Sequence, residues 1–141
     1  MSKATEATVS KKNPFWIPKN RYYELKYFCY QYQDWQKQYA SLDGLATREN
    51  REPTELEALE KVYLDGKIKL IQNTAALAGG WISDELLNGV TKGYSYDSMN
   101  TRKRMPCCRE VYYTIYRKFF WLLDKERELI PAQITLKTVV E

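Results

Sequence analysis

Six basic side chains gather within residues 102–118, where the sequence has a single acid, Glu110. They are Arg102, Lys103, Arg104, Arg109, Arg117 and Lys118. Such clustering is typical of proteins that bind phosphate groups, because each neutralised phosphate releases counterions. The run of three at 102–104 also fits another interpretation, the solvated C-terminal end of a helix, where cations are favoured.

Residues 108–123 predict a long amphipathic helix that carries the second half of this cluster. At about 100° per residue, one wide stripe of this helix is apolar. Its members are Cys108, Val111, Tyr112, Ile115, Phe119, Leu122 and Leu123. The opposite face carries Glu110, Tyr113, Thr114, Arg117, Trp121 and Asp124. Arg, Tyr and Thr on the uncovered face of the first turns suit the reading of base edges. An ordinary amphipathic helix in a small all-α bundle has the same pattern.

The elements before this helix have the layout of a helix-turn-helix. The sequence predicts a helix at 83–90, a turn at 92–94, a short helix at 95–104 and a break at 105–107. This order places the long helix in the recognition position. The predicted DNA-binding residues are Arg102, Lys103, Arg104, Arg109, Tyr113, Thr114, Arg117 and Lys118. The predicted core packs Tyr112, Ile115, Phe119 and Leu122 against Leu86, Leu87, Val90 and Met99.

Composition narrows the classes of function. The chain has 141 residues, a net charge of +4 and no histidine, which excludes His-based acid–base chemistry and Ser-His or Cys-His nucleophilic sites. Cys29, Cys107 and Cys108 are too few and wrongly spaced for a structural zinc site, and their odd number fits the reduced thiols of a cytosol. No apolar run approaches the roughly 20 residues of a membrane span. We therefore predict a cytoplasmic protein that is not an enzyme, with no catalytic residue, metal, cofactor or membrane partner.

The N-terminal half predicts a helical hairpin over residues 20–80, behind a flexible basic tail and Pro-rich anchor at 1–19. The first helix is expected at 20–42, ended by Asp43 and Gly44. Its apolar residues are spaced alternately three and four apart, as in a heptad seam. They are Leu25, Phe28, Tyr32, Trp35, Tyr39 and Leu42.

The second helix is expected to open with a capping box of Thr54 and Glu57 and to end at Gly79-Gly80. Its seam is Leu56, Leu59, Tyr63, Leu70 and Leu77, with Gly66 and Asn73 in the remaining slots. After the helix-turn-helix unit at 81–130, Pro131 is expected to stop the last helix. A short β-prone tail at 131–141 would then end the chain.

Residues 105–123 resemble the last helix of small helix-turn-helix proteins from phages and integrated elements of Firmicutes, which are themselves similar to region 4 of bacterial sigma factors. The late-gene transcription activators of the RinA/ArpU type are the best-known group. Their recognition helix has a Ser-Arg-x-Thr-Tyr-Tyr-like entry, and here Cys108-Arg109-Glu110-Val111-Tyr112-Tyr113 stands at that place. The entry therefore lacks both hydroxyl side chains, with Cys108 for serine and Val111 for threonine.

The resemblance implies an all-α fold, with an N-terminal helical hairpin followed by a C-terminal, sigma region 4-like helix-turn-helix. It implies a phage-type transcription regulator that binds double-stranded DNA near a promoter, with RNA polymerase as a further candidate partner. A helical protein–protein interaction module without DNA binding, such as a phage inhibitor of a host factor, fits the seams and the aromatic content equally well.

Trp121 lies on the solvent face of the long helix, and a large aromatic there predicts a contact. Its candidate partners are the anchor at 14–18, the C-terminal tail and a second subunit. We predict a weak homodimer through the N-terminal helices, with a seam of Leu25, Phe28, Tyr32 and Trp35.

Overall fold

The computed structural model describes the backbone of residues 14–140 and the side chains of residues 14–127, and within that range every regular element is a helix. The predicted flexible tail at 1–13 lies outside the described residues. The elements are α2 (Lys19–Tyr30), α3 (Tyr32–Arg48), α4 (Glu55–Gly79), the 3₁₀ turn η1 (Gly80–Ile82), α5 (Ser83–Lys92), α6 (Tyr96–Arg102) and α7 (Arg109–Val140).

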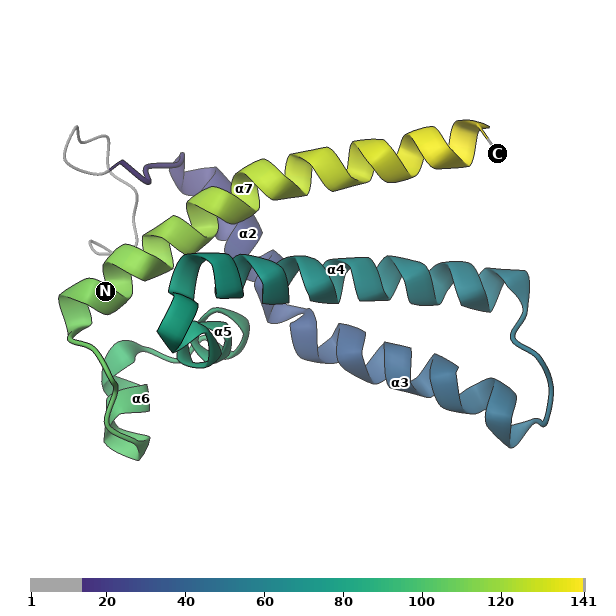
Figure 1. Cartoon of the computed structure of the whole chain (residues 1–141), viewed down its shortest axis with the longest axis horizontal. Helices are drawn as coiled ribbons and strands as arrows, with labels where there is room; N and C mark the ends of the chain where they lie inside the picture. Colours follow the sequence, from purple (N-terminus) through teal and green to yellow (C-terminus); the bar gives the residue numbers. More distant parts are fainter. Residues whose placement is uncertain (1–13, 141) are drawn as a thin grey trace.

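Helix α4 is the centre of the architecture, because it packs against α3, α5 and α7. Figure 1 shows α3 and α4 as an antiparallel pair, with α5 and α6 grouped at one end of the molecule near the start of α7. The predicted all-α fold with an N-terminal helical hairpin is confirmed.

The first predicted helix is in fact two helices that meet at Gln31. The Gln31 N–H bonds to the Phe28 carbonyl at 3.3 Å, which is a tighter, three-residue turn. The α-helical ladder resumes with the bond from the Trp35 N–H to the Gln31 carbonyl at 3.0 Å. This local tightening separates α2 from α3, so that α2 can pack against α5 and α7 while α3 packs against α4.

The predicted stop at Gly44 is wrong, since α3 continues through it to Arg48. Asn50 takes the left-handed conformation instead, with φ 51°, and the Arg51 N–H bonds to the Ala46 carbonyl at 3.0 Å. Such a six-to-one bond satisfies a terminal carbonyl and ends a helix. Asparagine tolerates this backbone better than most residues.

The capping box at the start of α4 is confirmed. The Glu57 N–H donates to the Thr54 Oγ1 at 3.1 Å, and the Thr54 N–H donates to Glu57 Oε1 at 2.8 Å. Arg51 Nη1 donates to the same carboxylate at 2.8 Å. The side-chain bond from Arg51, followed by the backbone bond from Thr54, lowers the pKa of Glu57 to about 2.

The buried face of α4 is not the predicted heptad seam. Of the five predicted positions only Leu70 is buried, whereas Leu56, Leu59, Tyr63 and Leu77 are exposed. The buried face is formed by Leu64, Ile68, Leu70, Ile71, Thr74, Ala75, Ala78 and Gly79. The seam assumed a single partner helix, but three helices surround α4 and together select a different face.

The buried stripe of α7 is turned relative to the predicted one. Tyr112, Phe119 and Leu123 are fully buried as predicted. Cys108 and Val111 are exposed, however, and Ile115 and Leu122 are only half-buried. On the other edge of the stripe, Tyr113, Tyr116 and Phe120 are buried.

Helix α2 explains this turn, because it covers α7 on that edge. The ring of Tyr22 packs edge-on against Phe120 with centroids 5.2 Å apart. The hydroxyls of Tyr22 and Tyr116 form a buried hydrogen bond of 2.9 Å. On the α5–α6 side, the predicted partners Leu86, Val90 and Met99 are buried as expected, and Leu87 is half-buried.

The seam of the first predicted helix packs inside the chain. Leu25, Tyr32 and Trp35 are buried, and the half-buried Phe28 packs edge-on against Trp35 with centroids 4.9 Å apart. These side chains are therefore not available to join two subunits, and a homodimer, which stays a prediction, would need another surface.

Trp121 contacts the N-terminal anchor. Phe15 packs edge-on against its ring with centroids 5.6 Å apart, and Lys125 Nζ lies 4.2 Å from the Trp121 centroid. Ile17 in the same anchor is buried. Of the three candidate partners of Trp121, the anchor at 14–18 is the one that the described residues place in contact with it.

Helix α7 extends to Val140, so the predicted stop at Pro131 and the predicted β-prone tail are both wrong. A proline removes one hydrogen bond from a helix interior, which weakens a long helix without always ending it. In the described part of the chain, no helix combines the length and the apolar character needed to cross a membrane.

Candidate nucleic-acid interface

The connection between α6 and α7 is fixed by side chains on both sides. Ser95 Oγ caps α6 by accepting a bond from the Ser98 N–H at 3.1 Å. Asn100 Oδ1 accepts a bond from the Met105 N–H at 2.8 Å, and the Tyr96 hydroxyl donates to the Cys107 carbonyl at 2.6 Å. The short loop that carries the basic run is therefore held in one path to the start of α7.

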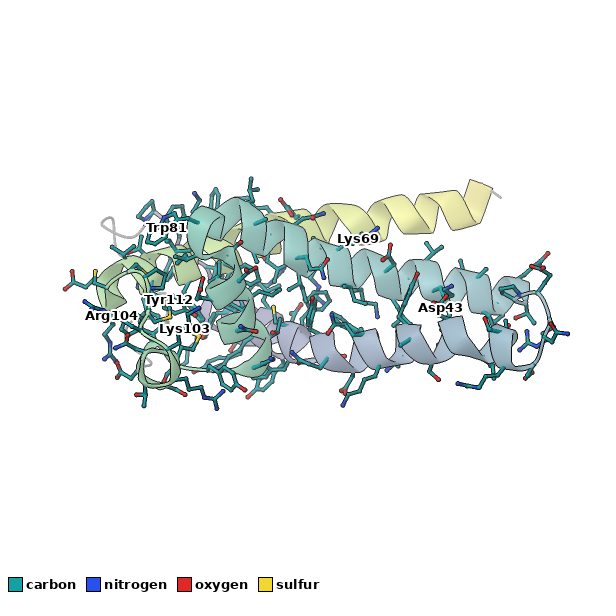
Figure 2. The ribbon with its side chains drawn as sticks, turned by 60° about the horizontal axis from the view of Figure 1, so that its bottom comes forward. Asp43, Lys69, Trp81, Lys103, Arg104 and Tyr112 are labelled. Atoms are coloured by element: carbon teal, nitrogen blue, oxygen red, sulfur yellow. The ribbon has the colours of Figure 1, made fainter. Side chains whose placement is uncertain are left out.

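The basic run Arg102, Lys103 and Arg104 is exposed, as predicted. Figure 2 shows Lys103 and Arg104 near one end of the molecule, far from Asp43 on α3. The guanidinium of Arg102 lies 4.4 Å from the ring centroid of Tyr94. A hydrogen bond from Arg102 to the Tyr94 hydroxyl lowers the pKa of that hydroxyl. The ring contact and this hydrogen bond together fix Arg102 against the turn before α6.

Two acids of α5 face the basic run across a hollow of about 340 Å³. One wall carries Asp84 and Glu85, and another carries Arg102, Lys103 and Arg104. Asp84 and Glu85 lie in the first turn of α5, where acidic side chains are favoured by the helix dipole. Their negative charge reduces the positive potential that the run presents.

Arg109, the first residue of α7, is held against α6. Its Nη1 donates to both carboxylate oxygens of Asp97, at 2.9 and 3.1 Å. Its guanidinium carbon also lies 5.9 Å from the ring centroid of Tyr113. The Arg109 side chain is nevertheless 47% exposed, so it is oriented by the protein and still reaches solvent.

Thr114 and Arg117 form the next part of the uncovered face of α7. Thr114 is exposed and its Oγ1 donates to the Glu110 carbonyl at 2.9 Å. Arg117 Nη2 donates to that same Oγ1 at 3.3 Å. Arg117 and Lys118 are half-buried, and burial lowers the pKa of Arg117. Arg117 and Lys118 are thus less accessible to a DNA ligand than we expected for residues of the DNA-binding surface.

Tyr113 is not on this surface, which corrects the prediction. It is only 6% exposed, and its hydroxyl accepts a hydrogen bond from the Tyr96 N–H at 3.2 Å. The reason is the turned stripe of α7, which directs Tyr113 toward α6 and α2. The structure also shows that Asp97 orients Arg109. Asp97 was not among the residues singled out from the sequence.

Burial affects two of the three thiols in the described residues. All three cysteines are free. Burial raises the pKa of the Cys29 thiol far above its ordinary value and also raises that of Cys107, so both stay protonated at neutral pH. Within the same range no group of three or more His, Cys, Asp or Glu side chains could hold a metal ion.

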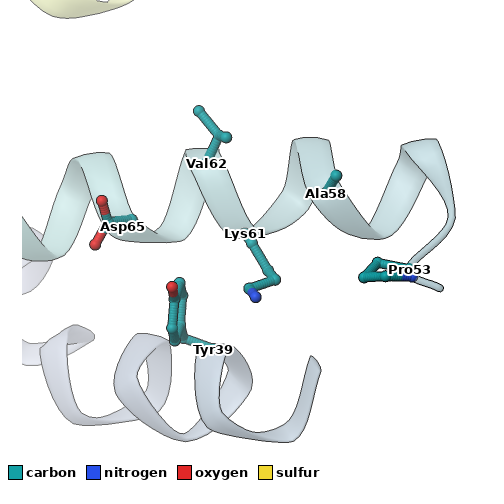
Figure 3. A pocket seen from close by; sticks show the side chains of 6 residues that line it. All are labelled: Tyr39, Pro53, Ala58, Lys61, Val62 and Asp65. Atoms are coloured by element: carbon teal, nitrogen blue, oxygen red, sulfur yellow. The ribbon is translucent and has the colours of Figure 1, made fainter. Parts of the chain in front are cut away.

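A separate hollow of about 270 Å³ lies between α3 and α4 (Figure 3). Lys61 lines this hollow, but its charge is already paired with an acid. The Lys61 Nζ lies 2.7 Å from Asp43 Oδ1 and 5.2 Å from the Tyr39 ring centroid. This hollow therefore offers less than the α6–α7 end for binding an anionic ligand.

No protein-family model, curated protein or solved structure matches the chain. The candidate site thus depends on its geometry and on the resemblance of residues 105–123 described above.

Proposed function

We propose that the protein binds double-stranded DNA with sequence preference and acts as a transcription regulator of phage or integrated-element type. In this proposal α5, α6 and α7 form the helix-turn-helix unit, and the first turns of α7 enter the major groove.

The observation that carries the proposal is the exposure of the basic run and of the uncovered side chains at the start of α7, which follows it in the chain. Lys103 and Arg104 supply positive charge directly before α7, while Arg109 and Thr114 present hydrogen-bonding groups on its uncovered first turns. Arginine pairs with guanine edges, and threonine can bond a base edge or contact the thymine methyl group. Lysine and arginine outside the helix suit phosphate contacts that fix its register.

The test starts with selection from a pool of random duplexes, followed by affinity measurements on the recovered site and on a scrambled site over a range of salt concentrations. Arg109→Ala is expected to reduce discrimination between the two duplexes by about 1–3 kcal/mol. Lys103→Ala is expected to weaken both duplexes alike and to lower the salt slope by about one. Lys37→Ala, an exposed lysine on α3, is the matched control.

The proposal fails if no site is enriched and duplex affinity does not depend on salt. It also fails if Arg109→Ala and Lys103→Ala behave like the Lys37→Ala control.

The exposed apolar stripe on α4 favours a second candidate function, a protein–protein interaction module. Leu56 and Val62 are 73% and 66% exposed, and the exposed Leu59 and Tyr63 lie on the same part of α4. Figure 3 shows Val62 directed away from α3. Exposed apolar patches of this kind mark interaction sites, and an amphipathic helix of a partner would fit a helical stripe. In a promoter-bound activator the partner would be a subunit of RNA polymerase.

This candidate is tested by titrating purified RNA polymerase with the labelled protein. Val62→Glu is expected to abolish association, whereas Gln38→Glu on the exposed side of α3 is expected to preserve it. Equal binding by both variants, or no binding by the unchanged protein, would exclude RNA polymerase as the partner of this stripe.

A further inference from the structure

A hollow of about 280 Å³ lined mainly by tyrosines lies where α2, the turn before α6, and α7 meet. Its tyrosines are Tyr22, Tyr23, Tyr30, Tyr94, Tyr113 and Tyr116. Lys26 is the one charged side chain among the lining residues, since the others are glycines and Ser95. The walls therefore offer phenol hydroxyls, aromatic faces and a single positive charge.

Lys26 has no carboxylate partner among the described residues. Its Nζ lies 5.8 Å from the ring centroid of Tyr22, 5.7 Å from that of Tyr23 and 6.0 Å from that of Tyr30. The three rings hold the ammonium in place through their negative faces without neutralising it. A half-buried cation fixed in this way, in a hollow without an acid, is suited to an anion.

The hydroxyl groups around Lys26 suit an anion with several oxygen atoms. A phenol hydroxyl can donate a hydrogen bond to such an oxygen, and bonds to a charged acceptor are stronger than bonds between neutral groups. Tyr23 and Tyr30 lie beside Lys26 on the same helix, and Ser95 adds a hydroxyl from the opposite wall. The size of the hollow accommodates a phosphate group.

The hollow is continuous with the proposed DNA surface through two tyrosines. Tyr94 carries the guanidinium of Arg102 at 4.4 Å from its ring centroid, and Tyr113 carries that of Arg109 at 5.9 Å. Both tyrosines also line the hollow. Arg102 and Arg109 therefore each contact a tyrosine that shares the hollow with Lys26.

We infer that this hollow is a phosphate-binding site in which Lys26 supplies the charge and the neighbouring tyrosine hydroxyls supply hydrogen bonds. In its DNA-bound form the site takes a backbone phosphate next to the segment read by α7, and this part of the inference rests on the proposed function. The DNA surface then extends from α7 across to α2.

The first experiment measures duplex affinity against salt concentration for the full chain. Lys26→Met keeps the stem of the side chain and removes its charge, so the slope of log affinity against log salt is expected to fall by about 0.9, the value for one phosphate contact on duplex DNA. Lys26→Arg is expected to keep the slope, and Lys37→Met on α3 is the matched control. A thermal unfolding scan of each variant verifies that it is folded.

The second experiment uses inorganic phosphate without DNA, and isothermal titration calorimetry at low ionic strength as the readout. Saturable phosphate binding that is lost in Lys26→Met and kept in Lys37→Met supports the site. This outcome supports the site even if the protein binds no duplex. The natural ligand is then a free phosphate or a phosphorylated small molecule. The inference is overturned, while the proposed function stands, under three joint conditions. The unchanged protein binds duplex, Lys26→Met has the same salt slope as the unchanged protein, and no inorganic phosphate binds. If neither duplex nor phosphate binds, both are overturned.

Discussion

The hydroxyl of Tyr113 on α7 accepts a hydrogen bond from the backbone N–H of Tyr96 at 3.2 Å, at the first residue of α6. The first N–H groups of a helix have no partner within it, so this bond satisfies one of them and joins the two helices. Tyr113 is thus a structural residue of the α6–α7 junction.

Tyr113→Phe is expected to lower the free energy of unfolding by about 1 kcal/mol, because it leaves a partly buried N–H without its acceptor. Urea unfolding followed by circular dichroism measures this change. Tyr27→Phe is the control, since Tyr27 is 61% exposed and the same chemical change there should have no effect. Equal stability of the two variants would show that the hydrogen bond contributes nothing.

Two further tyrosines of α7 are expected to respond to the same substitution in opposite directions. The Tyr112 hydroxyl is buried and has no hydrogen-bond partner among the described residues, whereas that of Tyr116 bonds to Tyr22 at 2.9 Å. Tyr112→Phe removes an unsatisfied polar group, so we expect it to raise the free energy of unfolding by about 1 kcal/mol. Tyr116→Phe removes the buried hydrogen bond to the Tyr22 hydroxyl and is expected to lower the free energy of unfolding by about as much.

Both variants are measured by urea unfolding at pH 7. Destabilisation by Tyr112→Phe would mean that its hydroxyl has a partner, such as an ordered water. A Cβ added at Gly89 would lie 2.0 Å from the Tyr112 hydroxyl, so Gly89→Ala should be strongly destabilising in the unchanged protein and milder alongside Tyr112→Phe.

Local signals in the sequence predicted the ends of some elements well. The capping box of Thr54 and Glu57 opens α4, and Gly79-Gly80 closes it, as expected. Such signals act between residues a few positions apart and do not depend on the rest of the fold. The helical class and the antiparallel pairing of α3 with α4 follow from the same kind of information.

The faces of the helices could not be read in this way. Periodicity marks an apolar stripe, but α4 has an exposed stripe at Leu56 and Leu59 as well as a buried one at Leu64 and Ile68. Which stripe is buried depends on how many helices surround it. For α7, the packing of Tyr22 from α2 turned the buried stripe toward Tyr113. The hydrogen bond between Tyr22 and Tyr116 that belongs to this packing joins residues 94 positions apart in the sequence. The same holds for a candidate site on one face of a helix: Arg109 is exposed as expected, whereas Tyr113 is buried.

Stability is expected to fall at alkaline pH and to stay nearly constant around neutrality. Burial raises the pKa of the Tyr112 and Tyr116 hydroxyls above the ordinary value of 10.0. A group with a raised folded pKa contributes stability that is complete below its unfolded pKa and is lost as the pH rises toward the folded value. The loss should therefore begin above about pH 10, where the unfolded chain ionises its tyrosines first.

Urea unfolding from pH 6 to pH 11 measures this dependence. The chain has no histidine, so little change is expected between pH 6 and pH 8. Tyr112→Phe should flatten the alkaline part of the curve, whereas Tyr27→Phe should leave it unchanged. A steep fall already near neutrality would assign the pH dependence to other groups.

The acids that face the basic run are expected to weaken DNA binding. Asp84 and Glu85 share a hollow with Arg102, Lys103 and Arg104, so a phosphate bound by the run would lie near their negative charges. A charge about 10 Å from a phosphate in water contributes roughly 0.4 kcal/mol, which is about a twofold change in affinity. Asp84→Asn and Glu85→Gln should therefore each tighten duplex binding about twofold at low salt, and screening should remove the gain at high salt.

The same substitutions should cost stability, because Asp84 and Glu85 lie in the first turn of α5, where each acid typically contributes 0.3–1 kcal/mol. Duplex affinity by fluorescence anisotropy and unfolding by urea, measured on the same variants, separate the two effects. Asp65→Asn on α4, which lies outside this hollow, is the control and should leave duplex affinity unchanged. Weaker binding by Asp84→Asn and Glu85→Gln would instead make these acids part of the DNA contact, as acceptors from base amino groups.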